Sequence, residues 1–291
     1  MSYNAAGVEA LVAIADHGTF DAAARALHVT PSAVSQRIRA LEQEVGQVVV
    51  RRGSPCVPTE AGAALVRLGR QTRLLDDEAR AALRAHVGRA EVTVAVNADS
   101  LATWFRDVLA DAEVQERLAL RLVVEDQAWS AELLRSGEAL AAVTDEPHPV
   151  QGCRSEHLGW LRYRPAATPA LAQRWAKGRS HDWQRMPVVV FNAKDALQDE
   201  VLRERGVTQP DVVHGVPTSA DFHEAVRRGL GWGMLPEPQL LPDLDAGRLV
   251  TLGGRTHRDV HLYWQRWRLD STTLTTLTDA VRRHAGAHLR T

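Results

Sequence analysis

Apolar residues recur at helical spacing in three short stretches at the start of the chain. The first predicts a helix from about Ala5 to Asp16. The second, "DAAARALHV", begins at Asp21 as the expected cap, and its alanines allow a close approach to a neighbouring helix. The third, residues 31–45, has Thr30 as its cap and Pro31 at its first position. Two helices, a tight turn and a third helix are typical of a helix-turn-helix unit.

The third predicted helix has two unlike faces. An apolar stripe at spacings of four, three and four consists of Val34, Ile38, Leu41 and Val45. The opposite side is short and rich in hydrogen-bonding groups, and it consists of Ser32, Ser35, Gln36, Arg39 and Gln43. Such a row is either ordinary solvated surface or a surface that reads a partner. After Gly46, "QVVVRRGSPCVPTEAG" predicts two short strands around a turn, a wing beside this helix.

A single long helix is expected from Thr59 to about Val87. Its small and apolar residues alternate at spacings of four and three, which is a heptad seam over most of four repeats. The seam consists of Ala61, Leu65, Leu68, Thr72, Leu75, Ala79, Ala82 and His86. So thin a stripe needs a partner, and the same helix of a second subunit is the simplest one. The other interpretation is a helix that packs on its own domain.

From Glu91 onward, strand and helix patterns alternate, which predicts open α/β sheets. Strands are expected in "EVTVAV", "LALRLVVED", "ALAAVTD", "MPVVVF", "DVVHGVP", "GWGMLP" and "RLVTLG". Sheets of this kind bind small molecules at the carboxyl ends of their strands, where helix N-termini point. A helix that begins near Asp99 or Ser100 would place Ser100 and the neighbouring amides at such an end, where they suit a carboxylate.

Composition narrows the class of protein. With 291 residues, 45% of them hydrophobic and 24% charged, the chain is an ordinary globular protein of two or three compact units. Its formal net charge of -1 does not by itself favour nucleic acid or membrane, so a DNA-binding surface must come from the placement of charges. Cys56 and Cys153 are expected to be reduced thiols, and no signal peptide or membrane-spanning run is evident. A cytoplasmic protein is therefore expected.

Catalytic and cofactor motifs are missing from the sequence. "GLGWGM" follows a predicted helix and precedes a strand, the reverse of the order in a nucleotide-binding loop. The 12 histidines form no metal-binding pair, and the region of Ser219 lacks the GxSxG pattern of a serine hydrolase. No enzymatic activity, cofactor or metal ion is therefore expected.

The stretch "FDAAARALHVTPSAVSQRIRALEQEVGQVVVRR" resembles the DNA-binding motif of LysR-type transcriptional regulators. The likeness continues through the long helix and a two-lobed domain. "AVNADSLATWF", "VEDQ", "YWQRWRL" and "GLGWGMLPE" further resemble the ArgP/LysG branch, whose members sense lysine or arginine and control the export of basic amino acids. The wing departs from the family, because Val49 and Val50 replace the usual Leu-Phe. Arg52 then takes the place of the family's arginine, and Arg51 is an additional charge.

The resemblance implies an α+β multidomain fold: an N-terminal winged helix-turn-helix, a long dimerisation helix and a two-lobed α/β effector domain like periplasmic binding proteins. The expected boundaries are 1–58 for the DNA-binding domain, 59–88 for the helix and 89–291 for the effector domain, with lobe I at about 91–163 and 267–291 and lobe II at about 164–266. The seam residues expected in dimerisation are Leu65, Leu68, Thr72, Leu75 and Ala79. Two copies of the third helix must reach two half-sites on the DNA, so at least a dimer is expected. The resemblance to the family implies tetramers.

The expected DNA-binding residues lie within or beside the helix-turn-helix from Phe20 to Arg39. They are Thr30, Ser32, Ser35, Gln36, Arg37, Arg39, Arg51 and Arg52. The resemblance implies that the two serines and Gln36 approach base edges or phosphates in the major groove. Glutamine can offer a donor and an acceptor together to adenine. Arg39 and the wing arginines would mostly position the domain on phosphates.

The effector pocket is expected among Ser100, Glu125, Asp126, Thr144 and Ser219. Glu125 and Asp126 end a predicted strand and suit the cationic end of lysine or arginine, although a local cap or salt bridge is their alternative role. Ser100, Thr144 and Ser219 would complete a ring around the α-carboxylate and α-amine of the ligand.

Double-stranded promoter DNA, a basic amino acid and further copies of the chain are therefore the expected partners. RNA polymerase is a further candidate, and no membrane is expected. Regulation would need only a ligand that binds two arrangements of the effector domain unequally. A plain solute-binding protein is the alternative, but it would need a signal peptide and would leave residues 1–87 without a purpose.

Overall fold

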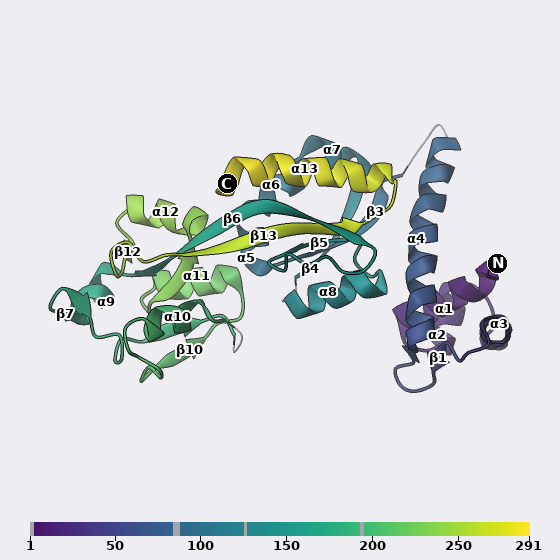
Figure 1. The fold of residues 1–291 in the computed structure, drawn as a ribbon, viewed down its shortest axis with the longest axis horizontal. Helices are drawn as coiled ribbons and strands as arrows, with labels where there is room; N and C mark the ends of the chain where they lie inside the picture. The colour runs from purple at the N-terminus through teal and green to yellow at the C-terminus, as the bar shows by residue number, and fades with distance from the viewer. Residues whose placement is uncertain (1–2, 84–87, 125–126, 193–194) are drawn as a thin grey trace.

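The computed structural model describes residues 3–83, 88–124, 127–192 and 195–291. The parts of the molecule follow one another along its long axis (Figure 1). One long helix joins a small helical domain at the N-terminus to a two-lobed α/β domain. This is the multidomain arrangement expected from the sequence. Over the described ranges, no helix combines the length and apolarity needed to cross a membrane.

Capped helices build the N-terminal domain: α1 (Ala5–His17), α2 (Phe20–Ala26) and α3 (Pro31–Val45). As predicted, Thr30 caps α3, because its side chain accepts a hydrogen bond from the Ala33 N–H. The prediction that Asp21 caps the second helix is wrong. Thr19 has the extended backbone of a cap and accepts the Ala22 N–H at 3.1 Å, so Asp21 lies inside the first turn.

The apolar stripe of α3 packs into the N-terminal core. Val34, Ile38 and Leu41 are buried in one cluster with residues of α1, and Val45 is partly buried beside them. The predicted wing is present as an antiparallel pair of short strands, β1 (Val50–Arg51) and β2 (Val57–Pro58). Burial of the stripe fixes the polar face of α3 on the outside of the domain.

The long helix α4 (Glu60–Leu83) contacts both domains. Its first turns pack on the N-terminal domain, where a Cβ on Gly62 would lie 1.8 Å from the Val49 carbonyl oxygen, so only glycine fits. Leu74, further along, is buried in the core of the two-lobed domain. Leu65 was expected in the exposed seam, and this expectation is wrong. Only 6% of Leu65 is exposed, because this turn faces its own domain.

Polar contacts also attach α4 to its own chain. Arg70 donates hydrogen bonds to the Ser136 carbonyl oxygen at 3.0 Å and to the Asp16 carboxylate of α1. Glu78 accepts two hydrogen bonds, at 2.5 and 2.9 Å, from the N-terminal end of α13 (Thr272–His288). One side of α4 therefore packs on its own chain, whereas the other side stays exposed.

A mixed sheet of seven strands extends through both lobes in the order β11-β6-β13-β5-β3-β4, with β12 beside β6, and its β5-β3-β4 end belongs to lobe I. Its three parallel strands, all expected from the sequence, are β3 (Ala90–Val96), β4 (Leu118–Val124) and β5 (Ala141–Thr144). The helices α6 (Phe105–Ala110), α7 (Ala112–Arg117) and α13 cover one face, and α8 (Gln127–Ser136) covers the other (Figure 1). The short helix α5 (Ala98–Ala102) follows the carboxyl end of β3.

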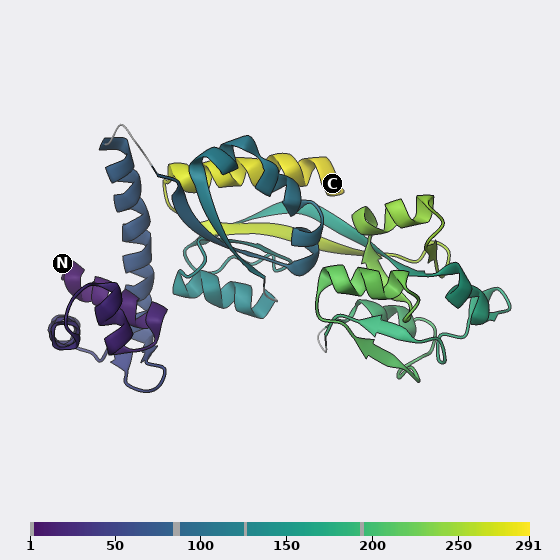
Figure 2. The same cartoon turned by 180° about the vertical axis from the view of Figure 1, so that it is seen from behind.

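Two long antiparallel strands, β6 (Cys153–Ala167) and β13 (Arg258–Trp267), run from lobe I into lobe II (Figure 2). The return to lobe I comes earlier than the expected residue 267, because residues 263–266 already pair with β5. The other strands of lobe II are β7 (Ala176–Lys177), β8 (Ser180–His181), β9 (Val188–Val190), β10 (Val213–Gly215), β11 (Gly233–Pro236) and β12 (Val250–Thr251). Its helices are α9 (Pro169–Arg174), α10 (Leu197–Arg203), α11 (Ser219–Arg227) and α12 (Glu237–Asp245).

Candidate functional site

The polar face of α3 offers free hydrogen-bonding groups to the solvent. Gln36 and Arg39 are exposed, and neither side chain has a hydrogen-bond or ion-pair partner in the part of the chain that the structure describes. Ser32 is exposed with its Oγ 2.9 Å from the Thr30 Oγ1, and Ser35 is half-buried. This row is therefore accessible to a partner without unfolding the domain.

The three other expected DNA-binding arginines differ in their surroundings. Arg37 is half-buried, and its guanidinium lies 4.0 Å from the Glu9 carboxylate, so it faces α1 rather than the outward row. Arg51 and Arg52 are exposed in the wing, as expected. The guanidinium carbon of Arg52 lies 5.1 Å from the centre of the Phe20 ring, a cation–π contact that joins the wing to the start of α2. Nothing in the sequence pattern points to this role of Phe20.

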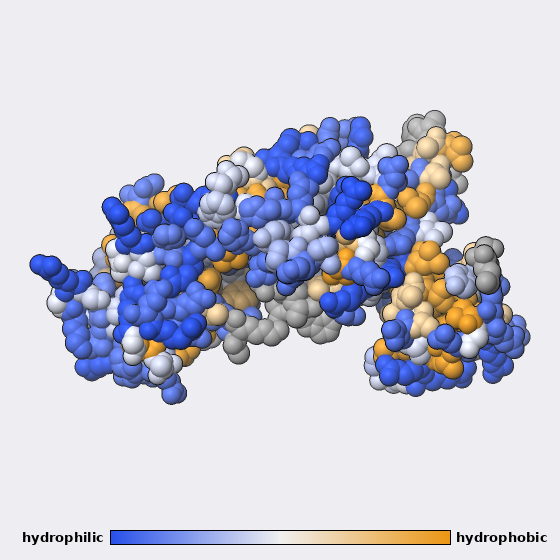
Figure 3. All heavy atoms as spheres, in the orientation of Figure 1, coloured by the Kyte–Doolittle hydropathy of each residue, from blue (hydrophilic) through white to orange (hydrophobic). Residues whose placement is uncertain are grey.

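Apart from Leu65, the seam residues expected in dimerisation lie on the exposed side of α4. Leu68, Thr72, Leu75 and Ala79 are all exposed, and Leu68 and Leu75 keep 41% and 39% of their surfaces accessible. Figure 3 shows hydrophobic surface along this helix. The last expected seam residue, His86, lies outside the described residues. Exposed leucines at this spacing form a surface that a second helix can cover.

In the two-lobed domain, the carboxylate of Asp99 is one of the groups that connect the lobes. Asp99 of α5 accepts a hydrogen bond from the Tyr163 hydroxyl of β6 at 2.8 Å and another from the Ser219 Oγ at 2.7 Å. Ser219 is the first residue of α11 in lobe II, so the contact joins α5 to the N-terminus of α11. Ser100, next to Asp99, is fully buried, and its Oγ has no partner among the described residues.

Two more carboxylates lie near Tyr163. Burial raises the pKa of the Tyr163 hydroxyl, and the charges of Asp99, Asp195 and Asp145 raise it further. Burial also raises the pKa of Asp145 and of Asp195 above the ordinary value. In the described ranges none of the three aspartates forms an ion pair. We call the region of Asp99, Asp145, Tyr163 and Asp195 the carboxylate cleft.

The expected effector residues are distributed unevenly. Ser100 lies beside Asp99 and Ser219 bonds to it, so the structure brings these two serines together. Thr144 is buried at the end of β5, directly before Asp145, and its Oγ1 accepts a backbone N–H at 3.1 Å. The other two expected residues, which were to hold the cationic end of a ligand, lie outside the described residues: Glu125 and Asp126.

The three aspartates of the carboxylate cleft were not among the residues expected from the sequence. Each follows a strand closely: Asp99 comes after β3, Asp145 directly after β5, and Asp195 after β9. The carboxyl ends of strands in open α/β sheets are the usual place for ligand-binding side chains. Their position after predicted strands was the feature of the sequence that pointed to these aspartates. This position alone does not distinguish them from the other polar residues at strand ends.

These parts together define a class of protein. A winged helix-turn-helix with an exposed polar face is joined through a long helix to a two-lobed domain that has a cavity between its lobes, which is the architecture of a ligand-responsive DNA-binding regulator. The chain matches the family model "Bacterial regulatory helix-turn-helix protein, lysR family" over residues 6–63 and the model "LysR substrate binding domain" over residues 85–286. The chain belongs to the LysR family.

Known relatives cover almost the whole chain. It is 48% identical to the lysine export transcriptional regulatory protein LysG of Corynebacterium efficiens, over 98% of both chains. The solved structure of full-length LysG from Corynebacterium glutamicum with bound effector Arg is similar with a TM-score of 0.85 and 43% identity, covering 99% of this chain and 100% of that one. ArgP from Mycobacterium tuberculosis is similar with a TM-score of 0.89 and 44% identity, covering 100% of this chain and 99% of that one.

The family assignment decides between the classes that the sequence left open. This chain is a DNA-binding transcriptional regulator and not an enzyme, as its relatives are. The match over residues 6–63 also removes the alternative of a solute-binding protein without a DNA-binding role.

Proposed function

We propose that this regulator senses arginine or lysine in the carboxylate cleft and adjusts the transcription of genes for the export or metabolism of basic amino acids. The observation that carries the proposal is the convergence of Asp99, Asp145 and Asp195 around Tyr163. Partly buried carboxylates without a cationic partner are unfavourable, and a cationic ligand removes this cost. The arginine-bound LysG of Corynebacterium glutamicum supports this choice of ligand.

The geometry also suggests how binding would be communicated. Asp99 holds both Tyr163 and Ser219, so a ligand cation that pairs with Asp99 competes with the existing contact between α5 and lobe II. The free Oγ of Ser100 is a further group for the amino-acid end of the ligand. A ligand that prefers one arrangement of the lobes shifts the population toward it. The N-terminal DNA-binding domains of the two subunits would then change their positions relative to each other.

On the DNA side, Gln36, Ser32 and Ser35 would contact base edges or phosphates, while Arg39 and the wing arginines hold the backbone. The exposed seam of α4, residues 68–79, would pair with the same helix of a second subunit. Dimers would join into tetramers through their effector domains. The protein would act in the cytoplasm on promoter DNA, with RNA polymerase as a candidate partner.

Calorimetry on the full-length protein tests the ligand. Titration with arginine, lysine, alanine and glutamate should give heat for arginine or lysine and none for alanine or glutamate. Binding of only a neutral or acidic amino acid would contradict the role given to the three aspartates.

Gel shifts with DNA from upstream of the protein's own gene test the DNA-binding residues. Gln36→Ala should lower discrimination between this DNA and random DNA by about 1–3 kcal/mol. Arg52→Ala should weaken binding to both and flatten the dependence of log affinity on log salt by roughly one unit. Arg121→Ala, an exposed arginine in lobe I, is the control and should change neither. If Gln36→Ala weakens both DNAs equally, Gln36 positions the protein and does not read the sequence.

A further inference from the structure

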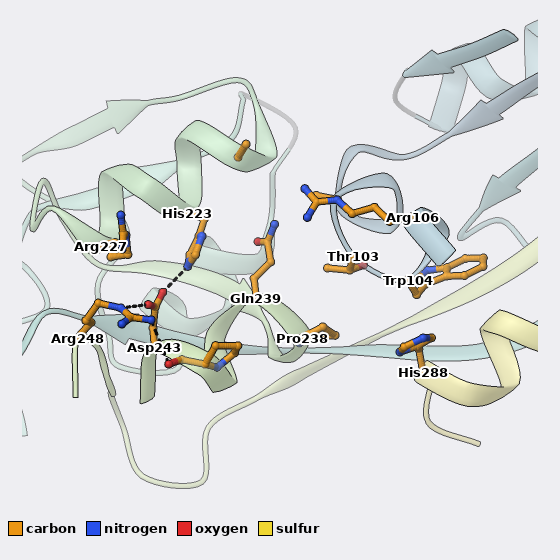
Figure 4. Close-up of a pocket in the computed structure, with 13 residues that line it drawn as sticks. Thr103, Trp104, Arg106, His223, Arg227, Pro238, Gln239, Asp243, Arg248 and His288 are labelled. Atoms are coloured by element: carbon orange, nitrogen blue, oxygen red, sulfur yellow. Dashed lines mark hydrogen bonds and ion pairs between the residues drawn. The ribbon is translucent and has the colours of Figure 1, made fainter. Parts of the chain in front are cut away.

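A cavity of about 480 Å³ lies between the lobes, and its walls come from both of them. Lobe I contributes the end of α5, the start of α6 and His288 of α13, and lobe II contributes α11 and α12 (Figure 4). None of the three aspartates of the carboxylate cleft lines this cavity. Its volume falls in the usual range for small-molecule sites.

The charges that line this cavity are mainly positive. The side chain of Arg106 extends from α6 into the gap between the lobes (Figure 4), and it has no ion-pair or hydrogen-bond partner within the described residues. On the opposite wall lie Arg227 and Arg248. Asp243 is the one carboxylate among the lining residues that the structure describes, and it already pairs with Arg248 and with His223, the latter at 2.6 Å.

The positive charge of Arg227 is only partly neutralised, because it shares its carboxylate partner with a second arginine. Its partner, Glu224, lies 2.6 Å from Arg227 and also 2.6 Å from Arg228, so one carboxylate serves two guanidinium groups. With Arg106 unpaired on the other wall, the lining has more cations than anions to neutralise them. An amino acid with a cationic side chain is repelled from such a site, whereas an anion is attracted.

We propose that this cavity binds a small oxyanion, a carboxylate- or phosphate-bearing metabolite, between Arg106 of lobe I and Arg227 of lobe II. Guanidinium groups present N–H donors in a planar fork that matches carboxylate and phosphate oxygens. The side-chain amide of Gln239 lies between the two walls and adds a neutral donor (Figure 4). The regulator therefore has two ligand sites of opposite charge at one interface between lobes.

An anion held by both walls would favour the arrangement of the lobes that brings Arg106 and Arg227 together. Gln239 also donates a hydrogen bond to the Ser219 Oγ at 3.4 Å, and Ser219 bonds to Asp99, so this chain of contacts connects the two sites. If arginine in the carboxylate cleft also selects one arrangement, the two ligands change each other's affinity by the same factor. This coupling rests on the proposed function, whereas binding of the anion does not.

Calorimetry with the full-length protein tests the site, with citrate and inorganic phosphate as separate probes and sodium chloride added to hold the ionic strength constant. At least one probe should bind. Arg106→Gln and Arg227→Gln should each weaken that probe by roughly tenfold to a hundredfold, the usual range for a lost charge-assisted hydrogen bond. Arg228→Gln is the matched control, because Arg228 bonds to the same Glu224 but does not line the cavity. The control should bind the probe as the original protein does.

Binding of citrate alone supports a carboxylate ligand, and binding of phosphate alone supports a phosphate-bearing one. No heat from either probe, or equal losses in Arg106→Gln and Arg228→Gln, overturns the proposal. Titration of the same variants with arginine checks their folding, and failure of arginine to bind the original protein would count against the proposed function only.

Discussion

In the N-terminal domain, every side chain that we propose for DNA contacts comes from one run of the chain, residues 30–52, whereas the carboxylate cleft collects Asp99, Asp145 and Asp195 from both lobes. The DNA-facing side chains are mostly exposed, and Gln36 and Arg39 have no partner within the described residues. The cleft aspartates bond across the lobes or are partly buried with a raised pKa.

The binding specificity of the two regions therefore depends on different levels of structure. A surface built from one helix and its wing needs only a buried stripe behind it, so its residues can change without disturbing the fold. A cleft built from several strand ends depends on the order of strands in the sheet and on the contact between the lobes. Burial makes the charged forms of Asp145 and Asp195 unfavourable, and a cationic ligand of the kind that we propose would offset this cost.

The largest effect is expected from the stripe behind the DNA-facing surface. Ile38→Ala removes a buried side chain that is only 2% exposed in the N-terminal core. It should destabilise this domain by about 2–5 kcal/mol. Hydrogen exchange over residues 31–45 measures the loss, and calorimetry should show that arginine binding persists. The control, Gln36→Ala on the exposed face, should leave stability within about 0.5 kcal/mol. Equal protection in both variants would contradict the assigned faces of α3.

A smaller effect is expected from the aspartate that connects the lobes. Asp99→Asn should weaken arginine binding by roughly tenfold to a hundredfold, because the amide keeps the shape but loses the charge that pairs with a cation. Calorimetry measures the change. Asp199→Asn, an exposed position on α10, is the control and should bind arginine normally. An unchanged affinity in Asp99→Asn would show that the cleft does not hold the cationic group.

The pH dependence of arginine binding should report the buried carboxylates. Burial raises the pKa of Asp145 and Asp195, so they take up protons at a higher pH than an ordinary aspartate does and then no longer attract a cation. Affinity should be complete above their raised pKa values and should fall below them, by up to about tenfold per pH unit for each group. Asp195→Asn should make this fall shallower. The same slope in both proteins would mean that Asp195 does not sense the ligand.

The smallest effect is expected from the ring that supports the wing. Phe20→Leu keeps an apolar side chain but removes the cation–π contact with Arg52. Loss of about 0.5–1 kcal/mol should weaken specific and random DNA alike by roughly twofold to fivefold. Phe20→Trp should restore affinity, because a larger ring keeps the contact. A gel shift measures both variants, and a failure of Phe20→Trp to recover binding would assign Phe20 to packing alone.

The parts of the fold that depend on neighbouring residues could be predicted from the sequence. The stripe from Val34 to Leu41, the Thr30 cap and the wing are all local, and all are present. The second cap was placed at Asp21 instead of Thr19, because both residue types suit a cap and only the backbone decides between them. Leu65 was placed in the seam because heptad spacing does not show which turns of a helix face their own domain.

The site in the effector domain could be predicted only in part. Ser100 and Ser219 were expected from helix N-termini, which are local features. Asp99 was noticed only as a helix start, and its bonds to Tyr163 and Ser219 require two residues far along the chain to meet. Such a meeting follows from the strand order and from the position of lobe II. Neither is encoded in the spacing of residues around Asp99.

The contacts of Arg70 affect how a movement in lobe I could be transmitted to the N-terminal domain. This one guanidinium touches Asp16 in the DNA-binding head and the Ser136 carbonyl at the end of α8 in lobe I. Because the same rigid group makes both contacts, a displacement of α8 must either break one of the two bonds or drag the head along with it. The N-terminal domain is then expected to adopt a few discrete orientations relative to lobe I rather than a continuous range of them.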